Sequence, residues 1–153
     1  MLRTMTAVRC EPVTAETHDA VIGLKVLPKQ KDFVASNKRS MKYARKHPGT
    51  EPLALFHGPE LVGFALLCPV TDVPWAVVLE RFMIDHRYQG RGLGRRGARA
   101  VLARCRAAGF RTIRLSVVPG NRVAFRLYRS LGFSETGEIE DGERVMELVA
   151  PDR

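Results

Sequence analysis

Short apolar runs, separated by glycine, proline, asparagine and aspartate, divide the chain into candidate strands and helices. Strands are expected where apolar residues run together or recur at every second position, and helices where they recur at every third or fourth. The strands predicted in this way are 4–12, 53–56, 61–67, 75–84, 111–117, 133–138 and 144–149. The predicted helices begin near Thr14, at Ser36 or Asn37, after Gln89 and after Asn121. The order β-α-α-β-β-β-α-β-α-β-β predicts an α+β fold with a mixed sheet.

Glycines and turn residues place the ends of several elements. The helix after Gln89 is expected to end at Gly109, and its apolar stripe consists of Leu93, Gly97, Val101, Cys105 and Ala108. Asp141 and Gly142 suit a tight turn between the last two strands, because both residue types accept a positive φ. No linker, repeat or low-complexity tract interrupts the series, so we expect a single domain over residues 1–153.

The net charge is the first clue to a partner. With 25 lysines and arginines against 16 aspartates and glutamates, the chain carries a formal charge of +9. This excess favours an anionic partner such as nucleic acid, an acidic surface or a phosphate-rich cofactor. The sequence has no apolar run of about 18 residues or more and lacks the apolar stretch of a secretory signal near residue 1. We therefore expect no membrane partner and a cytoplasmic location.

The cysteines do not form a recognisable framework. Cys10, Cys68 and Cys105 are odd in number and include no C-x-x-C pair. Neither disulfides nor a zinc site is predicted, and no other metal-ligating set is visible. We expect the three thiols to be buried as small apolar groups.

The segment 81–94 carries the clearest sign of chemistry. Its apolar strand runs into a glycine-rich turn and then directly into a helix. Unpaired backbone N–H groups and the dipole at a helix start favour an anion, and glycines let a phosphate approach the main chain. Four arginines surround this turn: Arg87, Arg91, Arg95 and Arg96. A tight turn alone would explain any one of the glycines, but it would not explain the arginines.

Two motifs resemble those of the GNAT family of N-acetyltransferases. Residues 89–94, Gln-Gly-Arg-Gly-Leu-Gly, are similar to its Q/R-x-x-G-x-G/A pyrophosphate loop, and residues 121–133 are similar to its N-x-x-A-x-x-L-Y-x-x-x-G-F motif. The order of elements matches the family's fold over nearly the whole chain. Residues 33–37 and 81–85 resemble the polyamine (spermine/spermidine) branch. The resemblance implies a twisted, mostly antiparallel mixed sheet of about seven strands with four helices.

This resemblance implies acetyl-CoA as the donor. The main chain that would hold its pyrophosphate is that of Gln89, Gly90, Arg91, Gly92, Leu93, Gly94 and Arg95. Main-chain groups of Phe82, Met83 and Ile84 would pair with the pantetheine arm like an added strand. Asn121 is expected both to cap its helix and to touch CoA. The phosphates of CoA match the local arginines in charge.

Acetyl transfer to an amine needs a proton acceptor and a proton donor. A primary ammonium has a pKa near 10.4, so roughly one molecule in a few thousand is nucleophilic at pH 7. Glu80, which interrupts an apolar strand and falls where certain polyamine acetyltransferases have a glutamate base, is the candidate acceptor. Apolar surroundings are expected for it, and a structural pair with a nearby arginine is the equally weighted alternative. Tyr128 is the candidate acid, because the resemblance places its hydroxyl against the departing thiolate; core packing is its alternative.

The predicted activity is direct attack by a primary amine of a small molecule on acetyl-CoA in a ternary complex, with neither a covalent enzyme intermediate nor a metal. A protein Nα- or lysine acetyltransferase is one alternative. A basic nucleic-acid-binding module or a non-catalytic acyl-CoA-binding module are others. No nucleic-acid motif accompanies the basic residues 38–46, so a nucleic-acid partner is not expected. A homodimer remains open.

The acceptor is the least determined part of the reaction. In the family, the segment 25–46 helps to cover the acceptor site. Here that segment holds eight cations, which are Lys25, Lys29, Lys31, Lys38, Arg39, Lys42, Arg45 and Lys46, against Asp32 alone. Since a buried ammonium needs an opposite charge, we expect spermidine and spermine to be poor substrates and an amine that carries a carboxylate, a phosphate or a bulky polar group to be a better one. Glu51, Glu60, Asp72 and Glu80 could still supply negative charge from other elements.

Overall fold

A single sheet runs through the computed structural model, which describes residues 7–151. Its strands lie in the order β1-β2-β3-β4-β5-β7-β6. Their bounds are β1 Val8–Pro12, β2 Glu51–His57, β3 Glu60–Pro69, β4 Ala76–Ile84, β5 Thr112–Val117, β6 Ser134–Glu140 and β7 Glu143–Val149. The helices are α2 His18–Gly23, α3 Asn37–Lys46, α4 Leu93–Ala107 and α5 Arg122–Ser130, with 3-10 turns η1 Pro28–Gln30 and η2 His86–Tyr88. The α+β class and the element order predicted from the sequence are confirmed.

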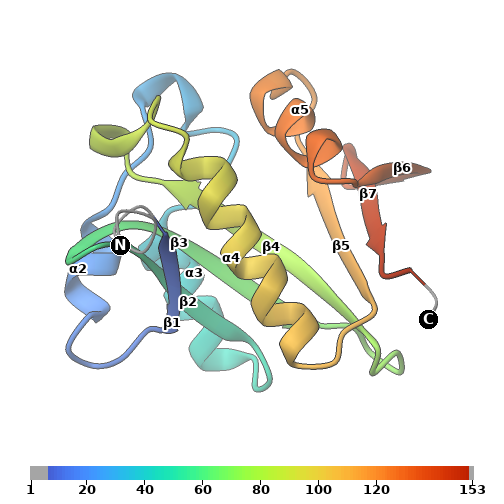
Figure 1. The fold of residues 1–153 in the computed structure, drawn as a ribbon, viewed down its shortest axis with the longest axis horizontal. Helices are drawn as coiled ribbons and strands as arrows, with labels where there is room; N and C mark the ends of the chain where they lie inside the picture. The colour runs from blue at the N-terminus through green and yellow to red at the C-terminus, as the bar shows by residue number, and fades with distance from the viewer. Residues whose placement is uncertain (1–6, 152–153) are drawn as a thin grey trace.

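The pairing between β4 and β5 sets the shape of the molecule. All neighbouring strands are antiparallel except these two, which are parallel over only three residue pairs, from Ala76 with Thr112 to Val78 with Arg114. Beyond Val78 the two strands diverge, and Figure 1 shows α4 on one side of the opening and α5 on the other. The sheet therefore splits into two parts that are joined at one end.

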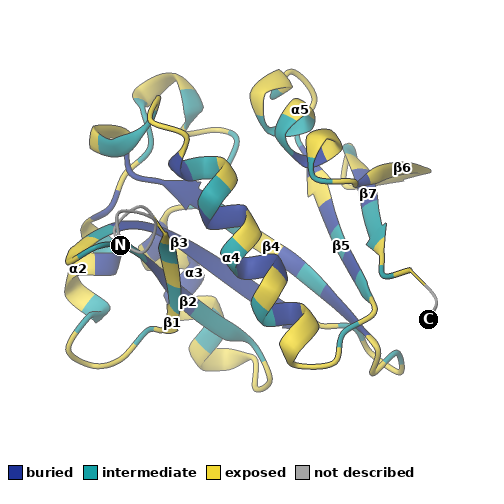
Figure 2. Cartoon of the chain, in the orientation of Figure 1, coloured by how far each residue is buried: buried dark blue, intermediate teal, exposed yellow. Residues whose placement is uncertain are grey.

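Two apolar clusters hold the helices against the sheet. One contains the inward side chains of α4 and α5, and the other packs α2 and α3 against the opposite face of β2 and β3. Gly97 lets α4 lie close to the sheet, because a Cβ there would come within 3.3 Å of Leu55 Cδ1 and 3.5 Å of Phe82 Cζ. In Figure 2 the buried side of α4 faces the sheet, whereas the edge strand β6 is exposed along its length.

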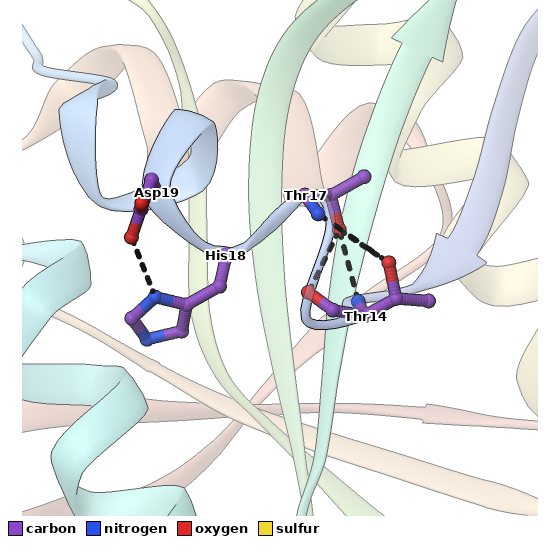
Figure 3. A network of polar contacts seen from close by, with 4 residues as sticks. All are labelled: Thr14, Thr17, His18 and Asp19. Carbon is purple, nitrogen blue, oxygen red and sulfur yellow. Dashed lines mark hydrogen bonds and ion pairs between the residues drawn. The ribbon is translucent and has the colours of Figure 1, made fainter.

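Several predicted boundaries are confirmed and a few are corrected. Ser36 and Asn121 cap α3 and α5 by accepting hydrogen bonds from Arg39 N and Ala124 N, at 3.2 and 3.3 Å. Figure 3 shows Thr14 and Thr17 bonded to each other in the turn before α2, where Thr14 N donates to Thr17 Oγ1 at 2.9 Å. Positions 4–6 of the first predicted strand lie outside the described residues. Ala108 is exposed rather than part of the apolar stripe of α4, because the helix has ended by that residue.

The thiols behave as small apolar groups. Cys68 and Cys105 are buried and Cys10 is partly buried, and burial raises the pKa of each thiol to about 11. Among residues 7–151, no helix combines the length and apolarity needed to cross a bilayer.

Candidate active site

Two clefts occupy the opening between β4 and β5. The larger has a volume of about 800 Å³ and the smaller about 230 Å³. They share six lining residues, which are Phe33, Val34, Phe82, Asn121, Ala124 and Tyr128. A molecule in the smaller cleft and a molecule in the larger one would therefore meet beside Tyr128.

The smaller cleft ends at the predicted phosphate loop. Gly90 and Gly92 have φ values of +80° and +75°, which favour glycine, and Gly92 precedes the first residue of α4. The first hydrogen bond within α4 runs from Arg96 N to Gly92 O at 3.3 Å. The amides of residues 93–95 therefore lie ahead of the helical hydrogen-bond ladder, as at any helix start. A Cβ at Gly90 would meet no atom within 4 Å, so the loop is open to a ligand.

The arginines around this loop also hold it in shape. Arg87 Nε donates to Asp85 Oδ1 at 2.8 Å, and Arg96 Nη2 donates to Arg91 O at 2.9 Å. Arg95 reaches across the opening and donates to Ser130 Oγ on α5. The loop therefore keeps its positive charge while its side chains fix the start of α4.

The outer edge of β4 forms one wall of the smaller cleft. Asp85 N donates to Val62 O at 2.8 Å, so the alternation of an antiparallel ladder turns the main-chain groups of Ile84 and Phe82 away from β3 and those of Met83 toward it. The expectation that three consecutive residues offer main-chain groups is thus wrong for Met83. Phe82 and Ile84 are the residues whose main-chain groups face the smaller cleft. One of these groups, Ile84 O, already accepts a hydrogen bond from Gln89 Nε2 at 2.9 Å.

Two residues for which no role was predicted fasten this loop to a distant segment. Asp85 is 1% exposed and accepts hydrogen bonds from Lys25 N at 2.9 Å and from Arg87 N at 3.0 Å. Burial opposes its ionisation, but the hydrogen bonds from Arg87 and Lys25 outweigh that effect and hold the pKa of Asp85 below its ordinary value. Gln30 forms a reciprocal amide pair with Gln89, at 2.9 and 3.1 Å. A polar residue at a strand end, two positions before an arginine, is the only local signal for Asp85.

Tyr128 lies on α5, on the same side of the helix as its N-cap residue Asn121. Its ring is buried and meets the edge of Phe133, with ring centroids 5.7 Å apart. Burial raises the pKa of its phenol, so the hydroxyl is protonated and available as a donor. Both clefts include this residue in their lining.

Glu80 occupies an irregularity in β4. The register with β3 shifts between Leu66 and Leu67, whose partners are Arg81 and Leu79, so Glu80 is the unpaired residue of a β-bulge. Its side chain is 41% exposed and lies 3.0 Å from Arg81 Nη1. The predicted apolar surroundings are therefore wrong, because the bulge turns the carboxylate into the larger cleft. The arginine pair that stood as the alternative is present.

The larger cleft is lined by more carboxylates than cations. The carboxylates are Asp32, Glu80, Glu140, Asp141 and Glu143, and the cations are Lys31, Arg39, Arg81 and Arg114. Three of the carboxylates come from the end of β6, the following turn and the start of β7, and no local sequence pattern places them there. Of the eight cations in segment 25–46, only Lys31 and Arg39 line this cleft, so the predicted basic wall is largely absent.

Ion pairing leaves part of this negative charge uncompensated. Arg114 lies 2.7 Å from Glu138 and 3.9 Å from Glu140, and Ser116 Oγ donates to Glu143 at 3.1 Å. Within the described residues, Asp32, Asp141 and Glu143 have no ion-pair partner. The end of the larger cleft formed by the turn at Asp141 therefore favours a cationic ligand.

Comparison with known proteins agrees with this geometry. The model of the Acetyltransferase (GNAT) family matches residues 14–133. The chain belongs to the GNAT family. It is 33% identical over 147 residues to the spermine/spermidine N(1)-acetyltransferase of Bacillus subtilis (strain 168), a match that covers 92% of this chain and 97% of that relative. The family and this relative make the protein an amine N-acetyltransferase.

Solved GNAT structures share the fold. Spermidine N-acetyltransferase from Vibrio cholerae, solved with CoA and spermine, has a TM-score of 0.75 at 16% identity and covers 93% of this chain and 95% of its own. A Bacillus subtilis acetyltransferase in complex with CoA has a TM-score of 0.71 at 19% identity, covering 94% of this chain and 99% of its own. Both neighbours are CoA complexes, and at these identities they show the shared fold.

Proposed function

We propose that this GNAT enzyme transfers the acetyl group of acetyl-CoA to a primary amino group of a polyamine, by direct attack in a ternary complex. The observation that carries the proposal is the meeting of the two clefts at Tyr128, with a glycine-rich helix start at the far end of one and unpaired carboxylates at the far end of the other. Each cleft thus matches one substrate in charge.

Acetyl-CoA would occupy the smaller cleft. The main chain of residues 89–95 would bind the pyrophosphate, and the nearby arginines would add charge-assisted contacts. The outward main-chain groups of Phe82 and Ile84 are suited to pair with the amides of the pantetheine arm, although Gln89 already occupies Ile84 O. Asn121, at the junction of the clefts, would contact the arm close to the thioester.

A polyamine would occupy the larger cleft. This assignment reverses the expectation that spermine is a poor substrate, because that expectation assumed that the cations of segment 25–46 cover the acceptor. The carboxylates of the β6–β7 turn offer an opposite charge to a distant ammonium, while the reacting amine lies near Tyr128. The relative from Bacillus subtilis is named for the same substrates.

Glu80 and Tyr128 would move the protons. Glu80 faces the acceptor cleft and would accept the proton of the attacking ammonium, directly or through water. Tyr128 would donate a hydrogen bond to the departing thiolate. Glu80→Gln should lower the rate near neutral pH and recover at higher pH, where free amine accumulates. A wild-type pH profile in this variant would assign the proton transfer to water alone.

The substrate is tested by measuring thiol release from acetyl-CoA with a matched set of amines. Spermidine and spermine should exceed butylamine in kcat/KM by roughly tenfold or more, because each distant ammonium that meets a carboxylate adds binding energy. A lysine-containing peptide or an amine that carries a carboxylate serves as the opposing probe. Preference for the peptide would instead indicate a protein acetyltransferase. The homodimer and the cytoplasmic location stay predictions.

A further inference from the structure

Residues 25–36, which we call the cover segment, form a wall of both clefts. Val26 and Gln30 line the smaller cleft, Lys31 and Asp32 line the larger one, and Phe33 and Val34 line both. No residue of this segment is buried. Val26 and Val34 pack against the α2–α3 cluster but are only partly buried, so polar contacts have a large share in fixing the position of this wall.

The ends of the cover segment are anchored to β4 and its continuation. At one end, Lys25 N donates to Asp85 Oδ2 at 2.9 Å and His86 N donates to Lys25 O at 2.8 Å. Just beyond the other end, Asn37 is buried and its Nδ2 donates to Val21 O at 2.9 Å and contacts Met83 Sδ at 3.7 Å. Between these anchors, the side-chain contact that joins the segment to the phosphate loop is the Gln30–Gln89 pair.

The side chain of Gln30 makes the hydrogen bonds that connect the cover segment to the phosphate loop. Its Oε1 accepts from Leu27 N at 3.1 Å, which fixes the turn η1, and from Gln89 Nε2 at 2.9 Å. Its Nε2 donates to Gln89 Oε1 at 3.1 Å. Gln89 in turn donates to Ile84 O on β4. One continuous chain of hydrogen bonds thus runs from the cover segment, through two amides, to the strand edge beside the donor.

We propose that Gln30 is a positioning residue for acetyl transfer: through its pair with Gln89, it holds the acceptor wall in place relative to the donor site. The proposal rests on the assignment of donor and acceptor to the two clefts. The amide of Gln30 is engaged by Leu27 and Gln89, so its role is to hold position and not to take part in the chemistry. Its loss leaves the main-chain cradle of residues 90–95 intact and displaces the wall that Phe33 and Val34 form at the junction.

Gln30→Met tests this role, because methionine keeps the length of the side chain and removes its hydrogen bonds. The KM for spermidine should rise about three- to tenfold, the range expected for one or two lost neutral hydrogen bonds. The KM for acetyl-CoA should change less than about twofold. Gln30→Glu keeps the two accepting bonds of Oε1 but sets a carboxylate oxygen against Gln89 Oε1, so it should recover only a small part of the loss. Lys29→Ala, an exposed position on the same 3-10 turn, is the matched control and should match the wild type.

A second set of measurements distinguishes a positioning role of Gln30 from a general loss of stability of the protein. Gln89→Met should also raise the KM for spermidine, and the double variant should show less than the sum of the two effects, because both variants remove the shared Gln30–Gln89 pair while each loses one further bond of its own. Hydrogen exchange in residues 25–36 should accelerate in Gln30→Met, while exchange in β4 stays unchanged. Spermidine KM within about twofold of the wild type, additive effects in the double variant, or uniform acceleration of exchange would each overturn the proposal. If the wild type does not turn over spermidine, the proposed substrate fails, and hydrogen exchange still decides the role of Gln30.

Discussion

The donor side and the acceptor side of the opening are built in different ways. The donor side is lined mostly by residues from two stretches of chain, 82–94 and 121–128, with four residues of the cover segment added, and its phosphate loop offers main-chain groups. The acceptor side gathers side chains from the cover segment, the β4 bulge, β5 and the β6–β7 turn, which are far apart in sequence. Recognition by backbone amides requires glycines and a helix start, so it leaves a readable pattern; recognition by scattered carboxylates leaves none.

This difference has a consequence for substitution. A backbone cradle is disrupted by atoms placed inside it, so a large or acidic side chain at a glycine of the loop should prevent binding, whereas changes at neighbouring positions should be tolerated. A wall of exposed carboxylates works through charge that solvent partly screens, so each of its members contributes modestly. Changes on the donor side should therefore be large and abrupt, and changes on the acceptor side small and graded.

The largest effect is expected at Gly94, whose φ is not positive and whose Cβ would lie 4.0 Å from the nearest atom, Ile84 Cγ1. Gly94→Asp should leave the free protein as stable as the wild type or more so, because a carboxylate suits a helix start. It should also abolish the rise in Tm caused by acetyl-CoA, which corresponds to about 2.7 kcal/mol of stabilisation at a hundredfold excess over Kd. Gly94→Ala is the control and should keep most of the shift. A full shift in Gly94→Asp would place the donor elsewhere.

Tyr128 stands where the two sides meet, and it should affect turnover more than binding. Tyr128→Phe should lower kcat on the order of ten- to a thousandfold, as for loss of a positioned proton donor. Acetyl-CoA affinity, measured by the Tm shift, should stay near the wild-type value, because the ring and its packing on Phe133 are retained. Tyr43→Phe, on the far helix α3, is the control. If kcat is unchanged, water protonates the thiolate.

Asp85 connects the two sides and should show its effect in the pH dependence of stability. Because its pKa in the folded protein is below the ordinary value of 3.8, its stabilising contribution is complete above that pH and is lost as pH falls through the folded pKa. Asp85→Asn should lower stability near neutral pH by about 1–3 kcal/mol, the cost of leaving buried donors unmatched. It should also flatten the decline of Tm at acid pH. Parallel Tm curves for the two proteins would contradict this assignment.

The smallest effect is expected on the acceptor wall. Glu143→Gln should raise the KM for spermidine roughly two- to fivefold, as for a partly exposed charge contact. It should leave butylamine unaffected, because a monoamine has no second ammonium to place there. Glu138→Gln is the control with the same change of side chain, because Glu138 pairs with Arg114 but does not line the cleft. Equal changes for both amines would remove Glu143 from substrate recognition.

Local chemistry explains which parts of the site were predictable. Local backbone geometry requires a glycine at positions 90 and 92 and a capping residue at Asn121. Their spacing in the sequence is therefore enough to indicate the predicted donor loop. Tyr128 followed from the family motif at 121–133, which places it on the same helix face as the cap. The environment of Glu80 did not follow, because a bulge depends on the register between two strands, which no local pattern specifies.

Hydrophobic period, caps and glycine conformation act over short stretches of chain, so the elements, their order and the glycine-rich start of α4 were predictable from local residues. Which carboxylates line the larger cleft and which amides join the two clefts depends on packing of the whole chain. Glu143 reaches the cleft because β7 pairs with β5, and Gln30 meets Gln89 because Asp85 holds Lys25 beside the end of β4. Such contacts join residues up to 60 positions apart, and their partners are chosen by packing of the whole sheet rather than by any property of either residue alone.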